Sequence, residues 1–431
     1  MKKTMQGSYQ RSAGFVLGLG MLLGFSGTLV SPTVTQAADP AFADLERLAT
    51  QSLTADIAAL PSGNFLKAGG HQFQGLWSRD FAFGTRGLMH LGRVDVFRDH
   101  LSLVLDHLRV SDGLVPRYLD SSNTTDRYIG GFLGKDIPLT EPLIANYSGG
   151  GNEGQAVDAN ALILIVALDY LHWTGDVTWW NNHQAQLVKA YRFYDAYLHE
   201  GLVVQPTFAD WQDSVNRQGK TFFCNLLFYV ATQRLQGYPG FNITSAQVAD
   251  LRAKLIQTFL DPTTGLYFSV AGQPQISLEG NLLAIDLGLH PAGSFEASVF
   301  YGKLRQHPLW TFDTGTFGVF PGYATYPDYP ASQIQWSVKL SGLSHYHDSI
   351  YWSWLIGLAA KVAYEVGDHV TGDGILTQMQ SMAIRDGGVA EIYRHEPPHE
   401  RWTSLRYHSE MPFTWGSSLI LDALGQRAVS P

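Results

Sequence analysis

Residues 159–171 read Ala-Asn-Ala-Leu-Ile-Leu-Ile-Val-Ala-Leu-Asp-Tyr-Leu, and they are apolar on nearly every face of a helix. A run of more than ten residues that is rich in Ala and Leu favours a helix over a strand. A helix that is apolar all round is surrounded by protein. The segment that follows, residues 177–200, is far more polar. We therefore expect an inner helix followed by an outer one.

The same contrast recurs along the chain. Apolar segments at residues 221–232, 277–289 and 351–366 alternate with more polar ones at 245–260, 294–306 and 376–385, and a last helix is expected at 407–424. Segments with the period of a strand are scarce, residues 267–270 being one candidate. The pattern predicts an all-α chain that forms a closed double ring of helical hairpins in one domain. An open helical solenoid is the alternative, but no repeat of fixed period is visible.

The composition favours an uncharged ligand. Charged residues make up 16% of the 431 residues and aromatic residues 13%. Such a chain suits a cleft in which rings stack on a ring-shaped ligand, although most aromatic side chains fill the core in any protein. The net charge is -9 and there is no basic run outside the N-terminus, so we expect no nucleic-acid partner. The single cysteine, Cys224, excludes a disulfide within the chain.

The N-terminal residues resemble a secretory leader. Lys2, Lys3 and Arg11 precede an apolar run at 15–30, and small residues around 35–38 offer a cleavage site. We predict that residues 1–37 are a signal peptide and that residues 38–431 form an exported domain, secreted or periplasmic. The domain would not insert stably in a membrane once the leader is removed. An uncleaved anchor is the alternative, and the oligomeric state is not indicated.

Two candidate binding segments combine a carboxylate with the start of a helix. In the first, Trp77 is followed by Arg79 and Asp80. The charged groups can bind sugar hydroxyls while the indole covers a ring face, although a helix cap is equally compatible. In the second, Asp158 opens the most apolar helix of the chain. It is a candidate for sugar binding or a simple N-cap.

Two further carboxylates are candidates for the chemistry. Asp210 and Asp213 flank Trp211, and a carboxyl group against an indole can have a raised pKa and act as a general acid. Glu391 lies among apolar residues after a Gly387-Gly388 break. Hydrolysis of a glycosidic bond needs two carboxyl groups, one to protonate the leaving oxygen and one to activate water. We predict Asp213 as the acid and Glu391 as the base, with Asp210 as the reserve acid because the sequence does not separate the two.

Residues 344–354 are rich in aromatic side chains that also carry polar groups, and His347 and Trp352 are candidates for contacts in the cleft. His345, His347 and Asp348 also suggest metal ligands. They lack the spacing of a known metal motif and have no companion cluster. We expect no metal and no other cofactor.

These residues together resemble the amylo-alpha-1,6-glucosidase part of glycogen debranching enzymes. Residues 77–80 and 113–116 are similar to its W-x-R-D and G-L-I-P stretches, and residues 158–159 with 174–176 to its D-A and T-G-D. Residues 211–213 are similar to its W-M-D, whose Asp is the general acid. Residues 390–393 and 397–399 are similar to its S-E-I-F and P-P-H, whose Glu is the general base.

The resemblance implies an (α/α)6 barrel and an inverting glycosidase. It departs from the family at Gln212 and Ser214 beside the acid, and at Arg394 and His395 after the base. Debranching enzymes also carry domains before the barrel for which this chain has little room. A bare barrel of this size is more distantly similar to alkaline/neutral invertases.

We therefore predict an exported inverting hydrolase of glucosyl bonds, with an alpha linkage expected, in oligosaccharides or small glucosides. In this hypothesis Arg79, Asp80 and Asp158 hold the sugar, and Trp77 and Trp211 stack on it. The alternatives are a disaccharide hydrolase similar to invertases or trehalases, and an inactive carbohydrate-binding barrel. A uronate-cleaving enzyme would need basic side chains in the cleft, so the directions of four arginines matter: Arg117, Arg127, Arg394 and Arg401.

Overall fold

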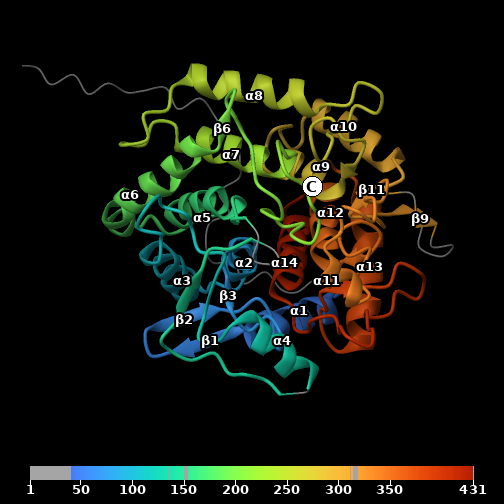
Figure 1. Ribbon diagram of the computed structural model, residues 1–431. Helices are drawn as coiled ribbons and strands as arrows, with labels where there is room; N and C mark the ends of the chain where they lie inside the picture. The colour runs from blue at the N-terminus through green and yellow to red at the C-terminus, as the bar shows by residue number, and fades with distance from the viewer. Residues whose placement is uncertain (1–39, 134, 150–153, 311, 314–318, 431) are drawn as a thin grey trace, which may run out of the picture. The chain divides into compact units, whose positions relative to one another are not determined.

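The computed structural model describes residues 40–133, 135–149, 154–310, 312–313 and 319–430 (Figure 1). Every described residue belongs to one compact unit of the chain. The predicted signal peptide lies outside the described residues. Among those residues, none of the helices has the length and apolar character needed to cross a bilayer.

The described residues are predominantly helical, as the sequence predicts. Their α-helices are α1 (Ala43–Ala55), α2 (Ser78–His90), α3 (Val94–Asp106), α4 (Thr124–Phe132), α5 (Asp158–Thr174), α6 (Val177–Arg192), α7 (Phe222–Leu235), α8 (Ser245–Phe259), α9 (Leu278–Asp286), α10 (Phe295–Gln306), α11 (Trp336–Leu340), α12 (Ser353–Glu365), α13 (His369–Asp386) and α14 (Thr414–Val429). The last helix begins at Thr414, so the expectation that it starts at residue 407 is wrong: residues 407–413 form a connection that reaches the candidate site.

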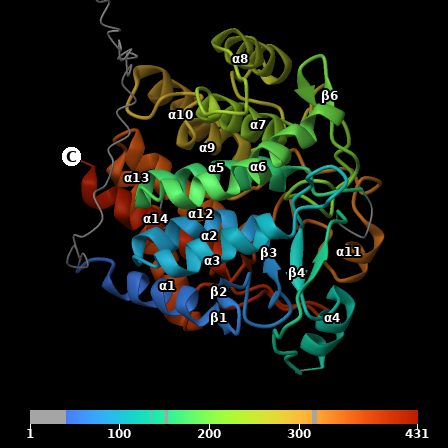
Figure 2. The same cartoon turned by 90° about the vertical axis from the view of Figure 1, so that its left-hand side faces the viewer.

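Contacts between six of these helices run in a closed cycle. Helix α2 packs on α5, α5 on α7, α7 on α9, α9 on α12, α12 on α14, and α14 again on α2 (Figures 1 and 2). Other helices pack on members of this cycle: α3 on α2 and α5, α6 on α5, α8 on α7, and α13 on α12. Helices α5 and α7 are buried along most of their length, whereas α6 buries mainly Trp179, Trp180, Leu187 and Ala190. The predicted contrast between inner and outer helices is present.

Short antiparallel strand pairs precede three helices of the cycle. Before α2, β3 (Leu76–Trp77) pairs with β4 (Tyr118–Asp120), which also pairs with β5 (Ile144–Asn146). Before α9, β8 (Ile276–Ser277) pairs with β11 (Thr325–Tyr326). Before α12, β12 (Tyr351–Trp352) pairs with β13 (Ile392–Tyr393). These pairs tie the connections to the N-terminal ends of the inner helices.

The remaining strands are short pairs: β1 (Ile57–Leu60) with β2 (Gly63–Leu66), β6 (Leu198–His199) with β7 (Leu202–Val203), and β9 (Phe312–Asp313) with β10 (Val319–Phe320). The expected strand at residues 267–270 is wrong. Tyr267, Phe268 and Val270 form only isolated bridges to different partners, so no ladder extends from one residue to the next.

Helices α12 and α14 approach so closely that glycine is required at their contact. A Cβ atom at Gly357 would lie 2.7 Å from the carbonyl carbon of Leu419 and 2.8 Å from the nitrogen of Ile420. Both of these are backbone atoms, which cannot move aside as a flexible side chain can. At Gly416, a Cβ atom would lie 2.0 Å from Ser353 Oγ. The two glycines therefore set the distance between these helices.

We predict that Gly357→Ala lowers the free energy of unfolding by about 1–3 kcal/mol, the usual cost of overpacking a core. The measurement is chemical denaturation followed by circular dichroism. The matched control is Gly302→Ala in α10, where nothing lies within 4 Å of the added Cβ. This control should be neutral or stabilising by up to about 1 kcal/mol, since Ala favours a helix over Gly. Equal effects of the two substitutions would contradict the packing argument.

Candidate active site

The candidate residues lie at the N-terminal ends of inner helices. Arg79 and Asp80 are in the first turn of α2, and Asp158 is the first residue of α5. Asp213 lies in the connection before α7, and Glu391 lies immediately before β13 in the connection between α13 and α14. Side-chain contacts described below join these segments, although the first and last of them are more than 300 residues apart in sequence.

Arg79 and Asp158 form a buried bidentate ion pair. Arg79 Nε lies 2.7 Å from Asp158 Oδ2, and Nη2 lies 3.2 Å from Oδ1. Helix α5 has no side-chain N-cap, so the capping interpretation of Asp158 is wrong. The Asp158 side chain is 0% exposed and both of its oxygens accept from Arg79. In this arrangement Asp158 orients Arg79, and the direct sugar contact we predicted for it stays a prediction.

Asp213 is surrounded by three basic side chains. Its Oδ2 atom accepts hydrogen bonds from Arg117 and, at 3.4 Å, from Arg79, while its Oδ1 atom lies 3.9 Å from His347 Nε2. Burial alone would raise the pKa of Asp213, but Arg117, His347 and Arg79 together lower it below its ordinary value. The expected raised pKa of this carboxyl group is therefore wrong for the unliganded protein, because the neighbouring positive charges outweigh the burial.

The structure separates Asp213 from Asp210. The Asp210 side chain is 1% exposed and lies 2.6 Å from Arg217 Nη2. It also accepts hydrogen bonds from Gln205 Nε2 at 2.9 Å and from the Gln212 backbone at 3.0 Å. The Asp213 side chain, in contrast, is 21% exposed. A ligand can therefore reach Asp213, whereas Asp210 is enclosed with its own partners.

Glu391 is buried and held by three donors. Its Oε1 atom accepts from the Tyr346 hydroxyl, and its Oε2 atom accepts from the Tyr407 hydroxyl and, at 3.1 Å, from the Glu410 backbone N–H. Burial raises the pKa of Glu391, against these hydrogen bonds and the charge of Arg401. Each carboxylate oxygen can accept about two hydrogen bonds. The acceptor position that the described residues leave unused is therefore on Oε1.

Asp80 is subject to the negative charges of both Asp213 and Glu391. The pKa of Asp80 is raised to about 7: burial and the negative charges of Glu391 and Asp213 raise it, and the positive charge of Arg79 opposes them. The side chain is half-buried, so part of it remains accessible. Of the residues predicted to hold the sugar, Asp80 combines accessibility with closeness to both Asp213 and Glu391.

A cluster of aromatic side chains packs beside Asp213. The Trp211 ring lies 5.0 Å from the His347 ring and 5.7 Å from the Trp352 ring, and His347 stacks on Trp352 at 5.7 Å. All three side chains are buried. The cluster supports Asp213 from within the protein, and burial leaves little ring surface for stacking on a ligand.

Trp77 is also engaged by protein. Its ring stacks on Tyr118 at 4.7 Å, and the Arg117 guanidinium lies over it at 4.9 Å. It therefore helps to place Arg117 beside Asp213. The predicted stacking of Trp77, Trp211, His347 and Trp352 on a sugar stays a prediction.

Of the four arginines whose directions the sequence leaves open, Arg117 reaches Asp213. The others bind acceptors in their own surroundings: Arg127 binds Asp120, Arg394 the Thr403 carbonyl, and Arg401 the Ser409 carbonyl. Arg117, Tyr346 and Tyr407 are site residues that sequence reasoning did not assign. Tyr346 lies in the ring-rich segment 344–354, where the sequence predicts contacts in the cleft, whereas no local pattern marks Arg117 or Tyr407.

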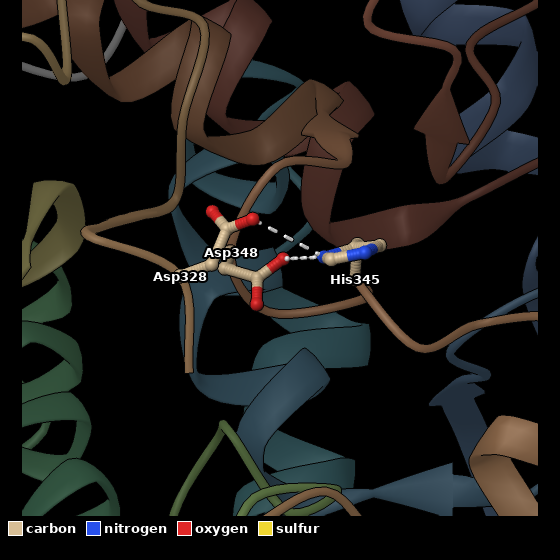
Figure 3. A group of neighbouring side chains, drawn as sticks. All are labelled: Asp328, His345 and Asp348. Atoms are coloured by element: carbon tan, nitrogen blue, oxygen red, sulfur yellow. Dashed lines mark hydrogen bonds and ion pairs between the residues drawn. The ribbon is translucent and has the colours of Figure 1, made fainter. Parts of the chain in front are cut away.

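Two of the three suggested metal ligands, His345 and Asp348, come together, and they are joined by Asp328 instead of His347. His345 Nδ1 lies 2.9 Å from Asp348 Oδ1 and 3.4 Å from Asp328 Oδ2 (Figure 3). His347 Nε2 lies instead 3.9 Å from Asp213 Oδ1. Asp348 also accepts hydrogen bonds from the backbone N–H groups of Ser349 at 2.6 Å and Tyr329 at 3.2 Å. Hydrogen bonds and ion pairs within the protein therefore explain why Asp328, His345 and Asp348 lie together.

The described residues have a fold that is found in glycosidases of known structure. A rhamnosidase from Klebsiella oxytoca with rhamnose bound matches 92% of this chain, with a TM-score of 0.60 and 15% identity, and the chain spans 65% of that protein's length. A wild-type glycosidase matches 91% of this chain, and the match covers 98% of that protein, with a TM-score of 0.60 and 15% identity. A GH63 mannosylglycerate hydrolase from Thermus thermophilus in complex with glucose matches 88% of this chain, and the match covers 99% of that protein, with a TM-score of 0.58 and 13% identity.

At these identities the likeness shows the fold. No protein-family model matches the sequence. A search of curated proteins finds no match either.

We predict that Asp158→Ala destabilises the protein by about 3–5 kcal/mol, because removing one partner of a buried ion pair leaves the other charge uncompensated. The measurement is the midpoint of chemical denaturation. The control is Asp44→Ala, which breaks the exposed pair between Asp44 and Arg47. It should cost less than about 1 kcal/mol. A loss at Asp158 as small as that of the control would show that the buried pair does not support the site.

Proposed function

We propose that this protein is a glycoside hydrolase built on an (α/α)6 barrel, with Asp213 as the general acid and Glu391 as the general base. The observation that carries the proposal is the pair itself: a partly exposed aspartate between two arginines, and a buried glutamate between two tyrosines. The closed cycle of six helices and the likeness in fold to glycosidases support the barrel and the class of reaction.

In the proposed reaction, Glu391 removes a proton from a water molecule whose oxygen attacks the anomeric carbon, and Asp213 protonates the glycosidic oxygen as its bond to that carbon breaks. Because the water attacks on the face opposite to the leaving oxygen, the anomeric configuration is inverted. The unused acceptor position on Glu391 Oε1 is where the water would donate. Asp213 must gain a proton when a substrate separates it from Arg117, since that arginine favours the ionised carboxylate. Arg79 and Asp80 would bind hydroxyl groups of the sugar through charge-assisted hydrogen bonds.

The charges of the site favour an uncharged sugar. Four carboxyl groups, those of Asp80, Asp158, Asp213 and Glu391, accompany the guanidinium groups of Arg79 and Arg117. Both guanidinium groups already bind carboxylates of the protein. A uronate would therefore meet more negative than positive charge. We propose a neutral glucosyl substrate, with an alpha linkage as the resemblance to amylo-alpha-1,6-glucosidases suggests, and we propose that the mature domain is exported.

The test is sugar release by the protein beginning at Ala38, on a panel of alpha-glucosides, rhamnosides, sucrose, trehalose and branched dextrins. We expect one class to be cleaved, and proton NMR of the first product to show the inverted anomer. Asp213→Asn and Glu391→Gln should each lower kcat by about 10²–10⁴-fold, the usual contribution of a general acid or base.

The control for these variants is Glu400→Gln, which changes an exposed carboxylate in the same connection as Glu391. It should leave kcat unchanged. Binding of sugars by the wild type without any release would favour the alternative of an inactive carbohydrate-binding barrel. Retention of the anomeric configuration would contradict the assigned roles.

The pH dependence follows from the environment of Glu391. A general base must be ionised, and burial raises the pKa of Glu391 above the value of about 4.3 for a free glutamate. We therefore expect kcat/KM to rise with pH along an acidic limb whose midpoint lies above about 4.3. Steady-state rates across the acidic and neutral range measure this limb, with thermal unfolding curves at each pH to exclude loss of the folded protein. A midpoint at or below that of free glutamate would contradict the role of Glu391.

A further inference from the structure

Glu410 is a buried carboxyl group next to the proposed base. The residue is 1% exposed, and no lysine or arginine forms an ion pair with it among the residues that the structure describes. Its carboxyl oxygens accept hydrogen bonds from two consecutive backbone N–H groups, those of His71 and, at 3.0 Å, of Gln72. A buried carboxylate without a positive partner is costly unless it is neutralised or well bonded. Its presence here needs an explanation.

The backbone of Glu410 is joined to Glu391 in both directions. The Glu391 N–H donates to the Glu410 carbonyl at 2.9 Å, and the Glu410 N–H donates to Glu391 Oε2 at 3.1 Å. The second of these bonds helps to set the orientation of the Glu391 carboxyl group. Glu410 is therefore tied directly to the base.

The side chain of Glu410 fixes a different segment, residues 69–72. A Cβ atom at Gly69 would lie 2.3 Å from Glu410 Cγ, and one at Gly70 would lie 2.7 Å from Pro412 Cδ. The two glycines therefore allow this segment to lie against the connection that carries Glu410. The same segment continues into β3 and then into Arg79 and Asp80 at the start of α2. Glu410 links the base to the residues proposed to bind the sugar.

The electrostatic surroundings of Glu410 are mainly acidic. The titratable groups that act on it are Glu391, Asp56 and His71. The pKa of Glu410 is raised to about 7, because burial and the charges of Glu391 and Asp56 outweigh the opposing effect of His71. Two neighbouring carboxyl groups in a dry site hold a proton between them more tightly than either would alone. Glu391 has three donors on its oxygens, two of them hydroxyl groups, which stabilise its ionised form.

We propose that Glu410 is a positioning residue for the base: it orients Glu391, anchors residues 69–72, and carries the proton that the two carboxyl groups share. This inference rests on the proposed role of Glu391 as the base. With the proton on Glu410, Glu391 is ionised and able to accept a proton from water, and the site contains one buried negative charge at this position instead of two.

Infrared difference spectroscopy tests the proposal without a substrate, because the carbonyl band of a protonated carboxyl group differs from the bands of a carboxylate. We compare the full chain with Glu410→Gln, Glu391→Gln and the control Glu400→Gln in mildly acidic buffer. The spectrum of Glu410→Gln should lack a band equivalent to one protonated carboxyl group, and the control should keep it. In Glu391→Gln the same band should remain at lower pH and titrate at least about one pH unit below the wild type, since the neighbouring charge is removed.

Two results would overturn the proposal. The band could vanish in Glu391→Gln at every pH while persisting in Glu410→Gln, which would place the proton on Glu391. Alternatively, neither variant could change the band, which would mean that both groups are ionised. If Glu410→Gln does not fold, the titration of the band in Glu391→Gln decides alone between these outcomes.

Turnover measured on the same samples separates this inference from the proposed function. The expected spectra without turnover of any glycoside would refute the glycosidase assignment and leave the shared proton in place. Turnover together with either of the two spectra that overturn the proposal would support the glycosidase assignment and refute the shared proton. For an active protein, Glu410→Gln should retain kcat within about tenfold, because its amide is permanently neutral like the protonated carboxyl group, whereas Glu391→Gln loses the base itself.

Discussion

The buried pair of Arg79 and Asp158 is the interaction on which the candidate site depends. It joins the first turns of α2 and α5, which are neighbours in the cycle of inner helices. Because both oxygens of Asp158 are engaged, the guanidinium group has a defined orientation, and its remaining Nη1 atom reaches Asp213. A charged group that is held in this way can act on a ligand without first being ordered.

The two proposed catalytic carboxyl groups have opposite environments. Asp213 lies among positive charges, which lower its pKa, whereas burial raises the pKa of Glu391. Different environments for two carboxyl groups are what an acid and base pair requires. In a simple assignment the general acid has a raised pKa and the general base a lower one, whereas in the unliganded protein the pKa of Asp213 is lowered and that of Glu391 is raised. The proposed roles therefore require that the binding of substrate changes the surroundings of Asp213. Arg117 is the side chain best placed for this change, since it contacts both Asp213 and the ring of Trp77.

Aromatic side chains in this protein mainly support the carboxyl groups of the site from the buried side. Trp211, His347 and Trp352 pack on one another beside Asp213, and Tyr346 and Tyr407 bind Glu391 through their hydroxyl groups. A large ring with a polar tip can fill a dry interior and still hold a carboxylate in place. The high aromatic content therefore reflects how the carboxyl groups are supported at least as much as how a sugar would be bound.

The helical class, the contrast of inner and outer helices, and the segments that carry the candidate carboxylates can all be predicted from the amino-acid sequence. These features depend on local patterns: residues 159–171 are apolar on nearly every face, and Arg79, Asp80 and Asp158 stand at the starts of helices. Which of these side chains come into contact is visible only in the folded chain. The fold distinguished Asp213 from Asp210, turned Asp158 toward Arg79, and brought Arg117, Tyr346, Tyr407 and Glu410 to the two carboxylates. These contacts join residues that are far apart in the chain, and pKa values depend on burial and neighbouring charges that local sequence does not specify.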